Sequence, residues 1–197
     1  MLRARTIILA VAAVAIFASA PVLAQDNTSK IFLTIDYVAP NGDDNITINT
    51  VTDAVKGSSD YGYEIGYEQR LGKIVGLEGS FLVGSNEFDF GDTTLGDLDQ
   101  RAITAAINFH IIPAKHFDLW LAPVASWYSF GDLDQIPDGD NLNDEWGYGA
   151  QLGFDIGFNK TFAITGGVRY VKIDIGDVAF NPVIARVGVA FRFGTRH

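Results

Sequence analysis

An alternation of apolar and polar residues, with a period of two, dominates this chain from residue 30 onward. In residues 61–71, tyrosine, isoleucine and leucine fill one row, while glycine, glutamate and arginine fill the other. Residues 147–158 and 183–193 repeat the arrangement. A period of two is typical of a β-strand, because successive side chains point to opposite faces. Helical periodicity is hard to find in the same region, and the sequence therefore predicts an all-β fold.

The alternation predicts eight strands whose connecting links are short and long in turn. The strands are expected at residues 30–39, 60–71, 74–85, 99–112, 116–129, 146–158, 162–174 and 182–193. Tight turns are expected at 71–74, 113–115 and 159–161, and polar loops at about 40–59, 86–98, 130–145 and 175–181. In an antiparallel up-and-down β-barrel, this alternation puts every short turn at one end and every long loop at the other.

The first 24 residues have the features of an export signal. Arg3 and Arg5 precede a nearly unbroken apolar stretch that is short for a membrane anchor and ends at Pro21. We expect residues 1–24 to be cleaved as a signal peptide and residues 25–197 to form one barrel domain. Cleavage lowers the formal net charge from −10 by two, to −12, and so acidic a chain is a poor partner for nucleic acid.

The mature chain has few other ways to become stable. It contains no cysteine, so packing or closure must replace disulfide bonds. No apolar run after residue 24 is long enough for a transmembrane helix. If the chain enters a membrane, it must do so as a closed barrel, which leaves no backbone group unpaired in lipid.

The alternation by itself fits both a soluble lipocalin-like calyx and a membrane barrel. Three features favour the membrane: small residues on the polar rows, charges of both signs on those rows, and aromatic residues near both strand ends. The aromatic residues near the long-loop ends are Tyr37, Tyr61, Tyr63, Trp127, Trp146 and Tyr170. Those near the short-turn ends are Phe109, Phe117, Phe158, Phe162 and Phe193.

The charged residues of the polar rows are the main candidates for a functional site. Those expected to meet inside the barrel are Glu64, Glu68, Arg70, Glu78, Asp118, Asp155, Arg169, Arg186 and Arg192. They would form either a gate whose ion pairs rearrange or a static network that fills the lumen. We favour the static network, because eight strands enclose just enough space for side chains.

Metal and catalytic sites have weaker support. Counted as a calcium loop, one acidic segment offers the ligands Asp134, Asp138, Asp140 and Glu145. Ile136 stands where that motif needs an oxygen ligand, and strands flank the segment, so a looser divalent site and a plain solvated loop remain as alternatives. We expect no cofactor.

No catalytic residue is expected either. Enzymes on barrels of this size, the lipid A acylase and deacylase, use a histidine with a serine and a carboxylate near the outer leaflet. His110 and His116 instead flank a short turn at the expected periplasmic end, and His197 is terminal. We interpret them as interface or turn residues and expect that the protein is not an enzyme.

The end of the chain resembles the C-terminal targeting pattern of outer-membrane barrels. Residues that match this pattern are Arg186, Gly188, Phe191 and Phe193. Gly194 to His197 extend past the aromatic residue at which such barrels usually end. The resemblance implies recognition by the outer-membrane assembly machinery.

Asn181-Pro182, the segment after Gly188 and the stretch from Gly147 to Gly176 resemble the OmpW family, which is grouped with the OmpA/OmpX transmembrane domain. The match is clear over the last third of the chain and architectural before it. It implies an eight-stranded barrel in the outer membrane of a Gram-negative bacterium, in contact with lipids and lipopolysaccharide. OmpW-type barrels are linked to a narrow apolar channel for small hydrophobic solutes, and a charged interior departs from that pattern.

Three functional hypotheses follow. The first is a structural or surface-interaction protein with a largely closed lumen, with both termini in the periplasm and the long loops outside. The second is an OmpW-like conduit for small hydrophobic molecules. The third is a soluble periplasmic calyx that binds an apolar ligand.

Overall fold

The computed structural model describes residues 28–41, 44–48, 51–90, 93–114, 116–131, 144–175 and 178–194. The expected signal peptide lies outside these residues. The described strands are β1 (Thr28–Ala39), β2 (Asp44–Ile48), β3 (Val51–Gly57), β4 (Asp60–Arg70), β5 (Val75–Phe90), β6 (Thr93–Pro113), β7 (Phe117–Phe130), β8 (Glu145–Gly157), β9 (Phe162–Ile175), β10 (Val178–Phe180) and β11 (Val183–Gly194). No helix in this part of the chain is long and apolar enough to span a bilayer.

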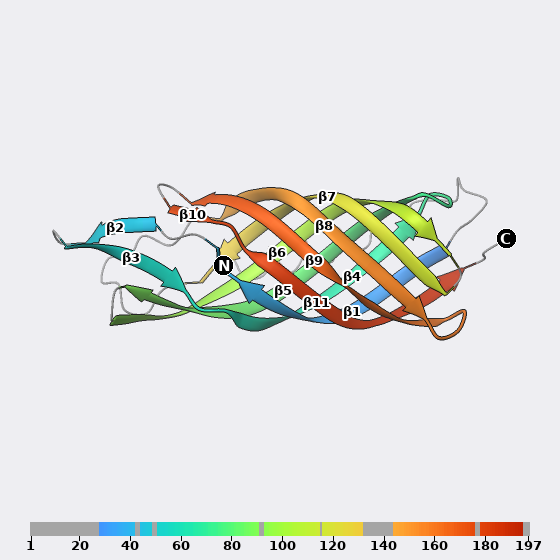
Figure 1. Ribbon diagram of the computed structural model, residues 1–197, viewed down its shortest axis with the longest axis horizontal. Helices are drawn as coiled ribbons and strands as arrows, with labels where there is room; N and C mark the ends of the chain where they lie inside the picture. The colour runs from blue at the N-terminus through green and yellow to red at the C-terminus, as the bar shows by residue number, and fades with distance from the viewer. Residues whose placement is uncertain are drawn as a thin grey trace, which may run out of the picture.

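Eight of the strands form a closed antiparallel barrel, as the sequence predicts (Figure 1). Around the wall their order is β1, β4, β5, β6, β7, β8, β9 and β11. The barrel closes between β1 and β11, where Thr28 is opposite Gly194 and Ala39 is opposite Val183. Closure pairs the backbone of every wall strand on both sides and leaves no open edge in the wall.

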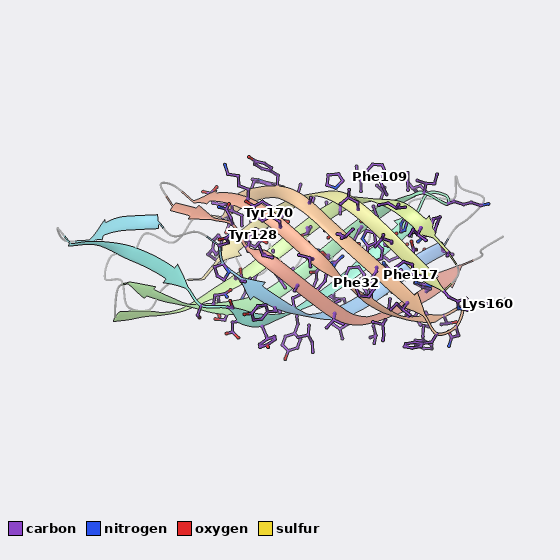
Figure 2. The ribbon with its side chains drawn as sticks, in the orientation of Figure 1. Phe32, Phe109, Phe117, Tyr128, Lys160 and Tyr170 are labelled. Atoms are coloured by element: carbon purple, nitrogen blue, oxygen red, sulfur yellow. The ribbon has the colours of Figure 1, made fainter. Side chains whose placement is uncertain are left out.

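The period-two alternation sorts the side chains between the two faces of the wall. The apolar row of β1 points outward, with Ile35 51% exposed, while Thr34 and Asp36 beside it are buried. The outer faces of β8 and β11 are alike, with Leu152 49% and Val187 57% exposed. Figure 2 shows Phe109 projecting from the wall, while Phe32 and Tyr128 are buried inside it. An apolar exterior around a polar interior is the arrangement of a membrane barrel and excludes the soluble calyx.

Glycines on the inner face make room for the largest interior side chains. A Cβ atom at Gly66 would overlap the ring of Phe32, and one at Gly153 would overlap the indole of Trp120. Phe32 and Trp120 are themselves almost fully buried. At these two positions the narrow lumen therefore accepts an aromatic ring because a glycine stands against it.

The short turns gather at one end of the barrel, called here the short-turn end. In the turn between β8 and β9, the side-chain Oδ1 of Asn159 accepts hydrogen bonds from the backbone N–H groups of Thr161 (2.7 Å) and Phe162 (2.8 Å). In the turn between β4 and β5, Gly72 has a φ of 135°, which favours glycine. These turns confirm the expected hairpin ends.

The opposite end, called here the long-loop end, holds more strand than the sequence predicts. The expected loop at 40–59 contains the hairpin of β2 and β3, and β3 pairs with the end of β5. The expected loop at 86–98 is largely the continuation of β5 and β6, and β10 pairs with β9 in the expected loop at 175–181. In Figure 1 this material projects beyond the barrel at the left. The prediction of polar loops in these three segments was therefore wrong. A strand that lies outside the bilayer needs no apolar row, so its sequence lacks the alternation that marks the strands of the wall.

Candidate functional site

The structure places all nine of the predicted interior charges in the lumen. Each of them is at most 8% exposed: Glu64, Glu68, Arg70, Glu78, Asp118, Asp155, Arg169, Arg186 and Arg192. They divide into two clusters along the barrel axis. The central cluster is built around Arg169 and Arg186, and the short-turn cluster lies around Glu68 and Asp155.

The central cluster joins strands from opposite sides of the wall. Arg169 on β9 donates two hydrogen bonds to the Glu64 carboxylate on β4, at 3.1 and 2.8 Å. Arg186 on β11 is 3.1 Å from Glu64 and 3.3 Å from Glu78 on β5. Two-pronged guanidinium–carboxylate contacts of this kind are strong and directional. They therefore fix four wall strands relative to one another across the lumen.

Two buried amides extend the central cluster to two further wall strands, β8 and β6. The side chain of Gln151 accepts from Arg169 at 3.1 Å and donates to Glu78 at 3.2 Å. Asn108 donates to the second oxygen of Glu78 at 2.9 Å. Each of these side chains is at most 2% exposed. Charged groups withdrawn so far from water need this degree of hydrogen bonding to be stable.

The short-turn cluster contains Lys30, which the sequence analysis did not include. Its ammonium nitrogen is 2.7 Å from Glu68 and 3.3 Å from Asp155. Arg192 approaches the same Asp155 oxygen at 3.0 Å. The ammonium nitrogen also lies 4.1 Å from the centroid of the Trp120 ring, which adds a cation–π contact. The cluster therefore binds β1, β4, β8 and β11 together near the short-turn end.

His110 belongs to this cluster, and its interpretation as an interface or turn residue was wrong. Its ring is buried, with Nε2 2.7 Å from Glu68 and Nδ1 2.9 Å from Asp118. Arg70 pairs with Asp118 and also contacts the ring. His110 occupies an inward position of β6, because Phe109 and Ile111 on either side of it point outward. His116, by contrast, lies at the β6–β7 turn as expected.

The strand register puts like charges directly opposite each other. Asp118 on β7 faces Asp155 on β8, and Glu68 on β4 faces Glu78 on β5. Directly opposed carboxylates destabilise a sheet unless something neutralises them. The cations that do so come from other strands, since Lys30 is on β1 and Arg192 is on β11. The opposed Asp118 and Asp155 are thus neutralised across the lumen, by Arg70 on β4 and by Lys30 and Arg192 on β1 and β11.

An apolar layer fills the lumen between the central cluster and the long-loop end. Its buried members are Val38, Leu82, Ala102, Ala106, Ala122, Val124, Tyr128, Val171, Ile173 and Ile184. At the opposite end, a small depression open to solvent is lined by Thr28, Ser29, Lys30, Glu68, Arg70, Asp155 and Arg192. The lumen therefore holds a large apolar cluster on the long-loop side of the central charges, together with buried amides such as Asn86 and Gln100.

The fold agrees with comparisons to known proteins. A model of the outer membrane protein β-barrel domain matches residues 10–193. The chain belongs to this family. It is an outer-membrane β-barrel protein, and the apolar outer face described above lies against membrane lipid. No curated protein sequence matches the chain.

Solved structures share the fold of this outer-membrane barrel at low sequence identity. OprG from Pseudomonas aeruginosa is 15% identical, with a TM-score of 0.71, over 87% of this chain and 98% of its own. The outer membrane protein W of E. coli is 15% identical, with a TM-score of 0.54, over 87% of this chain and 100% of its own. Ail from Yersinia pestis is 17% identical, with a TM-score of 0.53, over 86% of this chain and 100% of its own. At this identity the likeness concerns the fold.

The residues expected to carry an assembly signal lie on the last barrel strand. Phe191 and Phe193 point outward, and the Phe191 ring lies 5.5 Å from that of Phe162. Arg186 points inward, as described above. Gly188 is packed so tightly against β1 that a Cβ atom there would overlap the carbonyl of Leu33. A glycine at position 188 is thus required by the closing seam of the barrel.

The acidic segment proposed as a weak divalent site falls mostly outside the described residues. Asp134, Asp138 and Asp140 belong to residues 132–143, which the structure does not describe, and Glu145 begins β8. Elsewhere, the described ranges hold no group of three or more histidine or acidic side chains that could bind a metal ion.

Lys30, Asp36 and His110 are interior charged residues that the sequence analysis missed. The period of two in the sequence could have identified them. Asp36 and His110 each lie between two outward apolar side chains, and Lys30 lies directly before the outward apolar row of β1. Asp36, for example, lies between Ile35 and Tyr37.

Proposed function

We propose that this outer-membrane barrel is a structural and surface-interaction protein whose lumen is closed. The observation that carries the proposal is the ion-pair network that crosses the lumen from Arg169 and Arg186 to Glu64 and Glu78. Charged side chains that line an open, water-filled channel would be solvated, whereas these are almost completely withdrawn from solvent. The role of the nine charges is then to fill and fasten the barrel.

The apolar layer supports a closed lumen independently of the charges. Leu82, Ile173 and Ile184 are at most 1% exposed and pack against one another toward the long-loop end. Ions cross such a layer poorly because they must lose their hydration. A polar network in series with an apolar layer opposes the passage of both charged and neutral polar solutes.

The orientation and the partners of the barrel follow, in this proposal, from its negative net charge and from the difference between its short-turn and long-loop ends. In this proposal the short-turn end faces the periplasm, the long-loop end displays its acidic strands outside, and the partners there are lipopolysaccharide and other surface molecules. The outer-membrane assembly machinery would recognise the last strand, with Phe193 near its end. The proposal includes no catalytic residue, no cofactor and no nucleic acid partner.

Conductance of the purified full-length protein in planar lipid bilayers tests the closed lumen. We expect the current to stay at the level of the lipid alone. A matched variant, Arg169→Ala combined with Arg186→Ala, removes both cations of the central cluster and leaves the apolar layer in place. Current through this variant would assign the seal to the ion-pair network, whereas no current would assign it to the apolar layer. A steady open-channel current from the unmodified protein would contradict the proposal.

A conduit for small hydrophobic molecules is the second candidate, and the apolar layer favours it. An apolar solute would enter between side chains such as Leu82 and Tyr128, which ions would avoid. Uptake of an apolar tracer by cells with and without the gene separates the two candidates. An uptake defect without any conductance would favour the conduit.

A further inference from the structure

Asp36 is the one interior carboxylate whose charge the described cations do not balance. It is fully buried on β1, and its Oδ2 atom has no hydrogen-bond partner. The other oxygen accepts a hydrogen bond from Thr34 at 2.6 Å. A buried carboxylate that accepts from one neutral hydroxyl lacks the partners that an ionised group needs.

The charged groups around Asp36 leave a surplus of negative charge. In the strand register Asp36 is directly opposite Arg186 on β11. Glu64 on β4, Arg169 on β9 and the hydroxyl of Tyr128 on β7 also lie near it. The same two arginines approach Glu78 on β5. If every carboxyl were ionised, this cluster would hold three anions and two cations. In the short-turn cluster, by contrast, Lys30, Arg70 and Arg192 already match Glu68, Asp118 and Asp155.

Asp36 and Glu64 are diagonal neighbours on the inner face of the wall, because Asp36 on β1 is opposite Gly62 on β4 and Glu64 lies two residues further along that strand. Ionised carboxylates only accept hydrogen bonds, so a bond between two carboxyl groups requires a proton on one of them. Glu64 is held by Arg169 and Arg186, which favours its ionised form. The proton therefore belongs on Asp36, where it gives the unpartnered Oδ2 a donor role.

We infer that Asp36 is a proton-binding site inside the barrel: a neutral carboxylic acid that donates a hydrogen bond to Glu64. The bound proton equalises the charges of the central cluster without any further ligand. It also makes the interior sensitive to alkaline pH, because loss of that proton places a second, uncompensated negative charge beside Glu64. This site goes beyond the closed lumen proposed above and does not depend on whether the barrel conducts.

Infrared spectroscopy of the full-length protein at pH 7, in a detergent that contains no ester or carboxyl group, tests the inference directly. Exposed carboxyl groups are ionised at this pH, so a carbonyl band of a protonated carboxylic acid must come from a buried group. We expect such a band in the unmodified protein, its loss in Asp36→Asn, and its persistence in the matched control Asp155→Asn. Absence of the band from the unmodified protein would overturn the inference, as would its survival in folded Asp36→Asn.

A second variant keeps the inference testable if Asp36→Asn does not fold. Glu64→Gln removes the acceptor and one negative charge, so Asp36 should ionise beside the arginines and the band should again disappear. An unchanged band in Glu64→Gln would assign the proton to another group and contradict the inference.

The pH dependence of unfolding gives an independent readout. An unfolded aspartate ionises near pH about 4, while the folded protein keeps its proton above that pH. The unfolding equilibrium constant in urea should therefore rise by about tenfold per pH unit in the unmodified protein relative to Asp36→Asn. Parallel pH profiles of the two proteins would show that Asp36 holds no proton.

Discussion

Single residues set how the lumen is filled, and glycine is as important here as the charges. Gly153 packs against the indole of Trp120, so a larger side chain at residue 153 would overlap that ring. Gly153→Leu should therefore block assembly of the barrel, because closely packed interiors tolerate added bulk poorly. The measurement is the fraction of protein that shifts on a denaturing gel when boiled, a property of folded membrane barrels.

The control for this prediction adds the same bulk to the other face of the same strand. Ala150 is exposed on the outer face of β8, so Ala150→Leu should assemble normally. Equal assembly of the two variants would mean that the side chain of residue 153 is not confined by Trp120.

A charged side chain on the outer face should destabilise the barrel, whereas the paired charges in the lumen stabilise it. Leu152 and Val187 are exposed to lipid in the middle of their strands. An arginine at either position should reduce the free energy of unfolding by about 2–4 kcal/mol near the bilayer midplane. Urea unfolding in vesicles, with Leu152→Ala as the control for lost packing, measures the effect. Arginine variants as stable as the parent would place these residues away from lipid.

At the scale of the strands, the wall was predictable because the bilayer and the narrow lumen impose opposite chemistry on alternate residues. All eight wall strands, the three short turns and the facing of rows such as Ile35 and Val187 follow from that period. The same period also places Lys30, Asp36 and His110 inside. They were missed because only the other charged residues of these rows were predicted to meet in the lumen.

The contacts within the lumen and the strands at the long-loop end could not be predicted in the same way. Pairing partners such as Arg169 and Glu64 lie on strands that are not adjacent, so their meeting depends on the closed three-dimensional barrel. The ends of β5 and β6 are rich in aspartate, glycine and threonine, and outside the bilayer they lack the alternation that marks a strand.

The hairpin of β2 and β3 should be dispensable for the barrel. In the described residues it pairs with β5 through Val55, Lys56 and Gly57, whereas a wall strand such as β1 pairs with its neighbour β11 along its full length. Replacing residues 43–57 with a short glycine–serine linker should leave boiling-dependent migration unchanged, because loops on a barrel tolerate deletion when no wall pairing is lost. Failure of this variant to fold would make the hairpin part of the folding unit.

At the scale of the whole molecule, the central cluster connects strands that are far apart around the wall. Arg169→Met keeps the bulk of the side chain but leaves Glu64 with less positive charge around it. Removing one partner of a buried ion pair costs about 3–5 kcal/mol, and we expect a loss of this order in urea unfolding. Arg101→Met is the control, since Arg101 is exposed. A loss of less than about 1 kcal/mol, as for an exposed ion pair, would show that the network is not a cross-brace.

The length of β5 and β6 has a mechanical consequence. Their 16 and 21 residues far exceed the roughly 9–11 needed to cross the hydrocarbon, and their ladder continues without a break except for one bulge near Phe88. A force applied to the ends of β5 and β6 beyond the barrel would thus be transmitted along their hydrogen-bonded ladder into the wall that lies in lipid.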